Sequence, residues 1–312
     1  MLKALYLHTP FCKSKCSYCV YDSVQDSEKN INDYFNIKLP EVLRSECFRK
    51  ITEENNFEEL YCGGGTPTIG SADQWRNILS LLPLHKINML CMECSPSTVT
   101  PQHISLWREY KFKWISMGVQ SFNEDVLKIN NRSYTKKENI EKIATDIMSN
   151  NNILNIDLIC GLGTDPSKHI DLFLEDFYFT MSQIQPDSIT IHVNSKMSSV
   201  LLDRTYRALL DYLKGIEGYN DYICVNHDLI YLNVDTTLNS EFRFMRRNTD
   251  FIFRQMAAAP TKLVKNWLTW KLCEDGVVLQ SPEKESIHEI YVRDTSYRLF
   301  KTYRSKKNLK VF

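Results

Sequence analysis

Three cysteines near the N-terminus have the residue type and spacing of a metal site. Cys12, Cys16 and Cys19 lie in the stretch LHTPFCKSKCSYCVYDS with the spacing CxxxCxxC. A 4Fe-4S cluster usually takes four thiolates, so three leave one iron open to a substrate or cofactor, as catalytic zinc sites keep one open position. This vacancy favours chemistry over electron storage. An incomplete zinc knuckle, a redox dithiol in CSYC or chance would give the same spacing.

A glycine-rich segment and a carboxylate follow the cysteines. The segment YCGGGTPT at residues 61–68 lets the backbone approach a ligand closely, and its adjacent amides suit an anion. On its own, such a segment is equally typical of a tight strand-to-helix turn. Glu93 ends the apolar run NMLCMECS, where a carboxylate is costly to bury without a cationic partner. Together with the cysteines, these residues predict a ligand pocket.

A repeated strand-helix pattern must position these residues. Six apolar, strand-like runs near residues 5, 60, 90, 115, 156 and 190 alternate with segments whose apolar residues recur every three or four positions. This alternation predicts a parallel sheet covered by helices, an α/β fold of the partial (β/α)6 TIM-like barrel type. The active site of such folds gathers at the C-terminal ends of the strands, which is where the motif residues fall.

The pattern changes after about residue 200. We predict a core of residues 1–200 and a smaller mixed α/β appendage of residues 201–312 that covers the substrate. The predicted elements of the appendage are a helix at 201–216, two short strands within 221–236 joined near 226–228, and helices at 241–259 and 260–276.

Composition excludes several classes of partner. The 312 residues are 43% hydrophobic, and 38 basic residues balance 38 acidic ones, so no overall field favours nucleic acid or an anionic membrane. No apolar run approaches the roughly 18 residues of a membrane span, and no signal core is expected at the N-terminus. Most of the seven cysteines outside the triplet lie in apolar runs, and alternation along a strand puts Cys91 and Cys94 on opposite faces. We predict a cytoplasmic protein.

The ordered motifs resemble a known family. YLHTPFCKSKCSYC, CGGGTPT, MECSPSTVT, ISMGVQSFNEDVL, NNRSYT and NIDLICGLG follow one another from Tyr6 to about Gly163. This set resembles the radical S-adenosylmethionine (SAM) superfamily, in the branch of oxygen-independent coproporphyrinogen III oxidase and its haem-chaperone and methyltransferase relatives. The resemblance implies the same partial barrel, with a 4Fe-4S cluster on the three cysteines. It also implies that SAM chelates the fourth iron and is cleaved to a 5'-deoxyadenosyl radical, which abstracts hydrogen from a substrate.

The resemblance also implies two sets of cofactor contacts. Tyr6, Gly64 and Glu93 match positions at the first SAM, although a strand tyrosine is more often a core residue. The positions that contact a second SAM in the oxidase branch are Tyr18, Gly65, Thr66, Gln120, Arg132 and Asp157. An arginine fork suits a carboxylate, and an aspartate suits an amine or ribose hydroxyls. Taken one at a time, Arg132 would be a surface charge and Asp157 a strand-end cap. The full set of matching positions instead favours two bound SAM molecules, or one SAM molecule bound at both of its ends.

The sequence departs from the family pattern at three places. Trp114 stands two residues before Ser116, where the family often has arginine, Tyr134 replaces a histidine, and Gly163 replaces the proline of GLP. We expect these changes at the rims of the pocket. The long N-terminal extension and large C-terminal domain of the oxidases are also not expected, which weighs against oxidase activity.

Two residues are predicted to be catalytic. Tyr134 stands where the family has a histidine, and His192 falls near a strand end, where it can exchange protons with a substrate. His8 and Lys196 are further candidates, and His8 is equally well explained as a structural residue that holds the cluster loop.

The leading hypothesis is a radical SAM enzyme that modifies a small or medium organic molecule. Methyl or methylene transfer from a second SAM is the specific expectation, with flavodoxin or ferredoxin as electron donor. The alternatives are oxidative decarboxylation or another hydrogen abstraction, and a non-catalytic haem chaperone. Peptide modification is less expected, because only Cys224 and Cys273 follow the barrel as ligands for auxiliary clusters.

Overall fold

The fold is known from a computed structural model. It describes residues 3–19, 23–54, 57–194, 222–232, 237–246, 268–273, 276–281 and 290–294. The predicted helix at 201–216 and the candidate Lys196 lie outside these residues.

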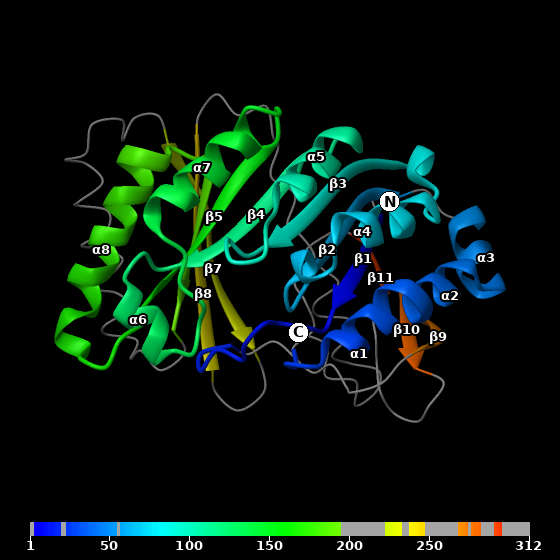
Figure 1. Cartoon of the computed structure of the whole chain (residues 1–312), viewed down its shortest axis with the longest axis horizontal. Helices are drawn as coiled ribbons and strands as arrows, with labels where there is room; N and C mark the ends of the chain where they lie inside the picture. The colour runs from blue at the N-terminus through cyan, green and yellow to red at the C-terminus, as the bar shows by residue number, and fades with distance from the viewer. Residues whose placement is uncertain are drawn as a thin grey trace.

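Six parallel strands form the centre of the fold and run in chain order across one sheet (Figure 1). Each pairs in parallel with the next, so every strand presents its C-terminal end at the same edge. The predicted parallel α/β core of the partial (β/α)6 type is confirmed. The strands are β1 (Lys3–Thr9), β2 (Phe57–Gly64), β3 (Ile87–Cys94), β4 (Trp114–Gln120), β5 (Ile153–Cys160) and β6 (Ser188–Val193).

Helices connect the strands. The helices that begin at Ala72 and Pro101 each start with a capping box, formed by Ser71 with Gln74 and by Thr100 with His103. These side chains bond to first-turn amides that have no partner within the helix. The helices are α1 (Glu28–Asp33), α2 (Leu39–Arg44), α3 (Glu46–Glu54), α4 (Ala72–Ser80), α5 (Pro101–Glu109), α6 (Glu124–Ile129), α7 (Lys137–Met148) and α8 (His169–Phe179). Short π or 3-10 turns are η1 (Tyr34–Lys38), η2 (Pro67–Ile69), η3 (Leu84–Lys86), η4 (Pro166–Lys168) and η5 (Thr180–Ile184).

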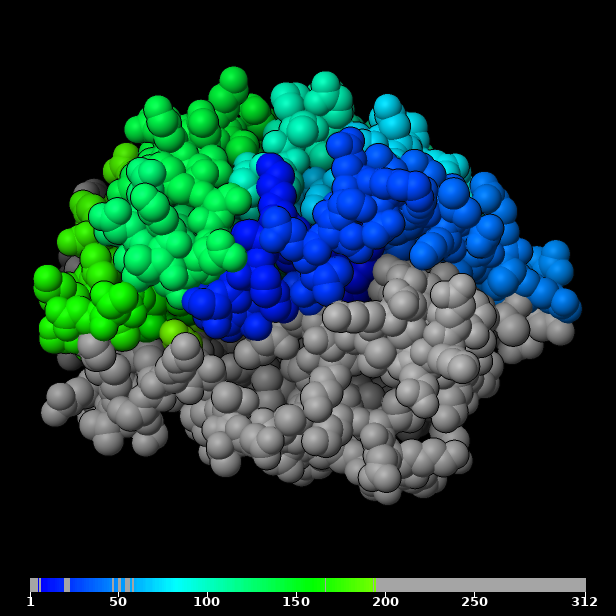
Figure 2. All heavy atoms as spheres, turned by 60° about the horizontal axis from the view of Figure 1, so that its bottom comes forward, coloured from blue at the N-terminus to red at the C-terminus, as the bar shows by residue number. Residues whose placement is uncertain are grey.

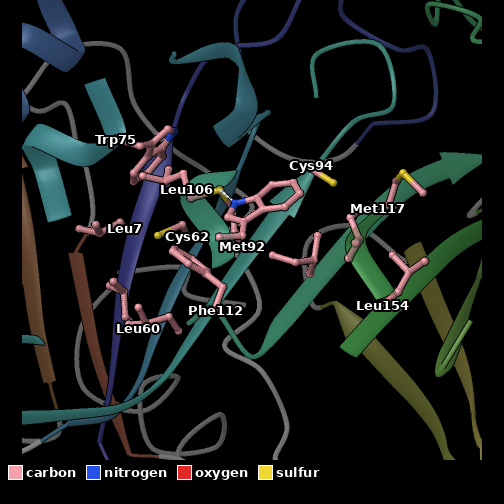
Figure 3. Packing of buried hydrophobic residues seen from close by; sticks show 14 of the residues in the cluster. Leu7, Leu60, Cys62, Trp75, Met92, Cys94, Leu106, Phe112, Met117 and Leu154 are labelled. Carbon is pink, nitrogen blue, oxygen red and sulfur yellow. Dashed lines mark hydrogen bonds between the residues drawn. The ribbon is translucent and has the colours of Figure 1, made fainter. Parts of the chain in front are cut away.

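The hydrophobic core lies between this sheet and the helices. Trp75, Trp107 and Trp114 are fully buried, and the indole nitrogen of Trp107 donates to Met92 Sδ at 3.3 Å. Figure 3 shows Cys62 among the apolar side chains of this core. Trp114 is the first residue of β4, at the opposite end from the motif residues, so the expectation that it reshapes the pocket rim is wrong.

Strands from the C-terminal part extend the sheet at both edges. They are β7 (Tyr222–Leu232), β8 (Thr237–Arg246), β9 (Leu268–Cys273), β10 (Gly276–Ser281) and β11 (Ile290–Asp294). β8 pairs antiparallel with β6 and with β7, and β11 pairs antiparallel with β1. β9 and β10 form a separate two-stranded sheet. Strands from either side of residue 200 thus share one sheet, and the boundary between residues 1–200 and 201–312 stays a prediction.

Three sequence expectations for the C-terminal part are corrected. The two short strands predicted within 221–236 are one continuous strand, β7, whose register shifts between Cys224 and Asn226. The predicted helix at 241–259 is strand β8 over residues 241–246, and the one at 260–276 is strand β9 over residues 268–273. In EFRF, residues 241–244, charged and apolar residues alternate with the period of a strand, and this segment pairs with β6 and β7.

Candidate cluster and cofactor site

The three cysteines lie in the loop that follows β1. The side chains of Cys12, Cys16 and Cys19 are partly exposed and form no disulfide. The Cys12 amide donates to Val24 O at 3.0 Å, and the Cys19 amide donates to Cys16 O at 3.1 Å. The first bond ties the start of the loop to its return, and the second forms a turn that brings the last two cysteines together.

The donor set consists of three thiols, the ligand type that an iron–sulfur cluster takes. Among the described residues, no three His, Cys, Asp or Glu side chains are close enough to share one metal ion. In a cluster each cysteine binds a different iron, so its ligands stand further apart. By contrast, burial raises the pKa of the thiols of Cys62 and Cys94, which keeps them protonated within the core.

The glycine segment at the end of β2 packs directly on the cysteine loop. Gly64 has a φ of +109°, and a Cβ there would lie 2.4 Å from the His8 ring. The amides of Gly65 and Thr66 donate to Thr9 O and Phe11 O at 2.5 and 2.8 Å. These two amides are therefore used within the protein, and the Gly64 amide binds a carboxylate of the protein itself, that of Glu93.

Glu93 ends β3 and faces this segment. Tyr61 donates its hydroxyl to Glu93 Oε1 at 2.6 Å, and the Gly64 amide donates to Oε2 at 3.1 Å. Burial and, to a smaller extent, the nearby charge of Asp157 raise the pKa of Glu93 to about 7, although the two hydrogen bonds act in the opposite direction. A cation placed beside this carboxylate would restore its charge, which is the environment that the amine of an amino acid needs.

Asp157 is held by a chain of buried polar side chains across β4, β5 and β6. Ser116 donates to Asp157 Oδ2 at 2.9 Å, and Asn155 donates to Oδ1 at 2.6 Å and to the Ser116 hydroxyl at 2.8 Å. Thr190 in turn donates to Asn155 Oδ1 at 2.9 Å, which fixes the orientation of that amide. Asn155 and Asp157 lie two residues apart on one strand and therefore share a face. The carboxylate is thus oriented before any ligand arrives.

Arg132 reaches from the α6–α7 connection to the cysteine loop. Its Nη1 lies 3.8 Å from Cys16 Sγ, and its Nη2 donates to Gly118 O in β4. Burial lowers the pKa of Arg132, but Tyr18 and Cys16 outweigh this effect, and the guanidinium stays charged. Among the described residues Gln120 Oε1 is buried without a hydrogen-bond partner, while the buried Tyr18 hydroxyl lies near Cys16 and Arg132.

The remaining predicted residues lie at varied places. His192 is partly exposed near the end of β6, and Tyr134 is partly buried in the segment that precedes α7. Tyr6 lies in β1 in register with Tyr61 of β2, and its side chain is outside the described residues. His8 is buried and its carbonyl accepts from Tyr34 at 2.7 Å, which suits a structural role.

A comparison with protein families identifies the superfamily of this chain. The profile of the Radical SAM superfamily matches residues 6–177, more than half of the 312 residues. The chain belongs to the radical SAM superfamily. Its cofactors are a 4Fe-4S cluster and SAM, and the cysteine loop with Glu93 at its side has the donors that both require.

Several radical SAM relatives resemble the chain. The oxygen-independent coproporphyrinogen III oxidase of Pseudomonas aeruginosa is 30% identical over 195 residues, covering 60% of this chain and 41% of the relative. The heme chaperone HemW of Buchnera aphidicola is 25% identical over 327 residues, covering 96% of this chain and 83% of the relative. The chain spans only 41%, 39% and 45% of the first three curated relatives. The solved structure of coproporphyrinogen III oxidase (HemN) from Escherichia coli has a TM-score of 0.65 at 17% identity, covering 95% of this chain and 72% of that one, which shows a shared fold.

Several residues that build this radical SAM site were missed in the sequence. Tyr61 precedes the glycine motif, Ser116 and Asn155 lie on neighbouring strands, and Asn130 precedes Arg132. Their partners lie at least two residues and up to 113 residues away in the chain. A polar residue two positions from Asp157 on a strand was the available signal for Asn155, because such residues share a face.

No helix in the described part of the chain is both long and apolar enough to cross a membrane.

Proposed function

We propose that the chain is a radical SAM enzyme in which Cys12, Cys16 and Cys19 hold the 4Fe-4S cluster. The observation that supports this most is the packing of the cysteine loop on the glycine segment, with Thr66 Oγ1 at 3.4 Å from Cys12 Sγ. Held by these three thiolates, a reduced cluster would supply the electron that splits SAM into methionine and a 5'-deoxyadenosyl radical, which takes a hydrogen atom from the substrate.

Glu93 is proposed to receive the cationic amine of the SAM molecule. Tyr61 and the Gly64 amide already fix both of its oxygens, so the carboxylate loses little freedom when the ligand binds. A positive ligand group would shift the carboxyl back toward its ionised form. Tyr6 remains a proposed contact of the same cofactor.

A second SAM is the basis of the proposed methyl or methylene transfer. Asp157, oriented by Ser116 and Asn155, offers an acceptor for an amine or for ribose hydroxyls. Gln120 Oε1 is a buried polar atom that no described residue satisfies, and Tyr18 lies beside Arg132 and Cys16. Gly65, Thr66 and Arg132 complete the proposed set, while Tyr134 and His192 are proposed to exchange protons with the substrate.

The substrate is proposed to be a small or medium organic molecule, and the electron donor a flavodoxin or ferredoxin. The proposed compartment is the cytoplasm, where the cysteine loop would stay reduced before the cluster is loaded.

Product analysis tests the proposal. The full chain is reconstituted anaerobically with iron and sulfide, reduced with dithionite and incubated with SAM, and 5'-deoxyadenosine and S-adenosylhomocysteine are quantified. Formation of 5'-deoxyadenosine that is lost in Cys16→Ala supports radical chemistry. Deoxyadenosine without any S-adenosylhomocysteine, across candidate substrates, would contradict methyl transfer and leave hydrogen abstraction or oxidative decarboxylation as the activity.

A haem chaperone is the second candidate. The observation that favours it is the match to HemW of Buchnera aphidicola, which covers 96% of this chain and 83% of that protein. A chaperone would bind haem stoichiometrically and cleave little SAM under dithionite. Haem titration followed by absorbance, run beside the product analysis, separates the two functions.

A further inference from the structure

A three-residue segment after α6 is hydrogen-bonded to the cysteine loop. The Ser17 amide donates to Asn130 O at 3.1 Å, and the Ser17 hydroxyl donates to Asn130 Oδ1 at 2.7 Å. Asn131 donates its side-chain amide to Lys15 O at 3.0 Å, and Arg132 contacts Cys16 Sγ at 3.8 Å. In Figure 2 the blue atoms of the N-terminal segment lie directly beside green atoms of this part of the chain. We call residues Asn130, Asn131 and Arg132 the bracket.

The bracket is firmly anchored to its own helix. Asn130 is the C-cap of α6, and its side-chain amide donates to Val126 O at 2.8 Å. Asn131 has a φ of +54°, a left-handed conformation that asparagine tolerates better than most residues. The Arg132 amide then returns to Leu127 O at 2.9 Å. The bracket therefore offers the cysteine loop a preformed surface.

Arg132 joins this surface to the sheet. One terminal nitrogen of its guanidinium bonds to Gly118 O in β4, and the other points at Cys16 Sγ. A carboxylate fork needs two donors of the same guanidinium. Arg132 has five N–H donors, so the contacts of its two terminal nitrogens leave others for the proposed contact with a second SAM, and they add a role at the cluster.

A donor with a positive charge beside a ligating sulfur changes the cluster's reduction potential. Reduction adds negative charge, and hydrogen bonds or cations near the sulfurs stabilise the reduced state more than the oxidised one. We infer that the bracket is a positioning and tuning element of the cluster: Arg132 raises the reduction potential through Cys16, and Asn130 with Asn131 holds the loop that carries the cysteines. The inference rests on the proposed cluster at these cysteines.

Redox titration of the reconstituted full chain, followed by electron paramagnetic resonance, tests the tuning. We expect a more negative midpoint potential in Arg132→Gln than in the unchanged protein, and a smaller downward shift in Arg132→Lys, which keeps the charge but loses the fork. Arg108→Gln removes one positive charge from the exposed face of α5 and is expected to leave the potential unchanged.

The rate of iron release to a chelator tests the positioning. Asn130→Ala removes the acceptor of the Ser17 hydroxyl but leaves Arg132 in place, so we expect faster iron release with an unchanged potential. Asn77→Ala on α4 is the matched control, because no described hydrogen bond links its side chain to the cysteine loop.

The outcomes separate the inference from the proposed function. If the unchanged protein retained no cluster, both would be overturned. If the cluster formed but Arg132→Gln kept the original potential, the inference alone would be wrong. If Arg132→Gln does not retain a cluster, the potential of Arg132→Lys is measured instead. An unshifted midpoint potential in Arg132→Lys would then contradict the tuning role.

Discussion

The cysteine loop and the carboxylates Glu93 and Asp157 lie at the same edge of the sheet but are held in different ways. The loop depends on contacts from distant connections, such as Lys13 Nζ to Ser97 O at 2.6 Å and Ser17 Oγ to Asn130 Oδ1 at 2.7 Å. The carboxylates stand on strands and are oriented by side chains of neighbouring strands.

This difference indicates a division of labour. A loop has many conformations, so several independent tethers are needed to fix three cysteines at once. A strand already fixes the direction of its side chains, so one or two hydrogen bonds suffice for each carboxylate. Damage to the loop should therefore affect the cluster, and damage to the carboxylates should affect the bound cofactor.

The largest expected effect comes from the loop itself. Cys16→Ala removes one of three thiolates, and we expect complete loss of SAM cleavage and of most bound iron. The thermal midpoint of the cluster-free protein should stay nearly unchanged, because Cys16 is partly exposed and outside the core. Iron and sulfide assays with thermal unfolding measure both. A large drop in the midpoint would show that the loop is part of the folding core.

Glu93→Ala tests the role of the carboxylates in binding SAM. A hydrogen bond to a charged group is worth about 1.5–3 kcal/mol, so we expect SAM to bind roughly 10- to 150-fold more weakly, with the iron content retained. Equilibrium dialysis of the reconstituted protein measures this change. Glu109→Ala, on the outer end of α5, is the control. Loss of the cluster in Glu93→Ala would contradict the proposal that the loop holds the cluster and the carboxylates hold SAM.

Tyr61→Phe removes one of the two donors to Glu93. We expect SAM binding to weaken by about 0.5–1.5 kcal/mol, roughly 2- to 13-fold, because Glu93 remains but is less firmly oriented. Tyr178→Phe makes the same chemical change at a tyrosine that is 50% exposed on α8, and it should leave binding unaffected. Equal effects from the two substitutions would contradict the orienting role.

A pH dependence of stability tests the same carboxylate. The pKa of Glu93 is raised to about 7 from its ordinary 4.5, so its contribution to stability is full below 4.5 and is lost as pH rises through 7. Both proteins are compared without a cluster. The thermal midpoint of the unchanged protein minus that of Glu93→Gln should therefore fall from pH 5 to 7 and stay level above pH 7.

Asp176 does not disturb this comparison. Burial raises its pKa to about 6, but the residue is the same in both proteins and its contribution cancels. A difference that rises with pH would contradict the environment described for Glu93.

The sequence allowed the six parallel strands and the placement of the motif residues at their ends to be predicted, because alternation of apolar strands and amphipathic helices is a local signal. The C-terminal strands β8 and β9 were missed, since their pairing with other strands decides between helix and strand. The bracket could not be predicted either. Asn130 and Ser17 are 113 residues apart, and nothing local to either residue indicates the other.

The antiparallel strands at the two edges of the parallel sheet have a consequence for handling the protein. β11 covers the free side of β1, and β8 covers the free side of β6. An uncovered strand edge presents unpaired N–H and C=O groups that recruit other chains into aggregates. A fragment that ends at residue 200 would expose both edges at once. It would keep every cysteine of the cluster motif and still precipitate, which light scattering of the truncated and full chains would reveal.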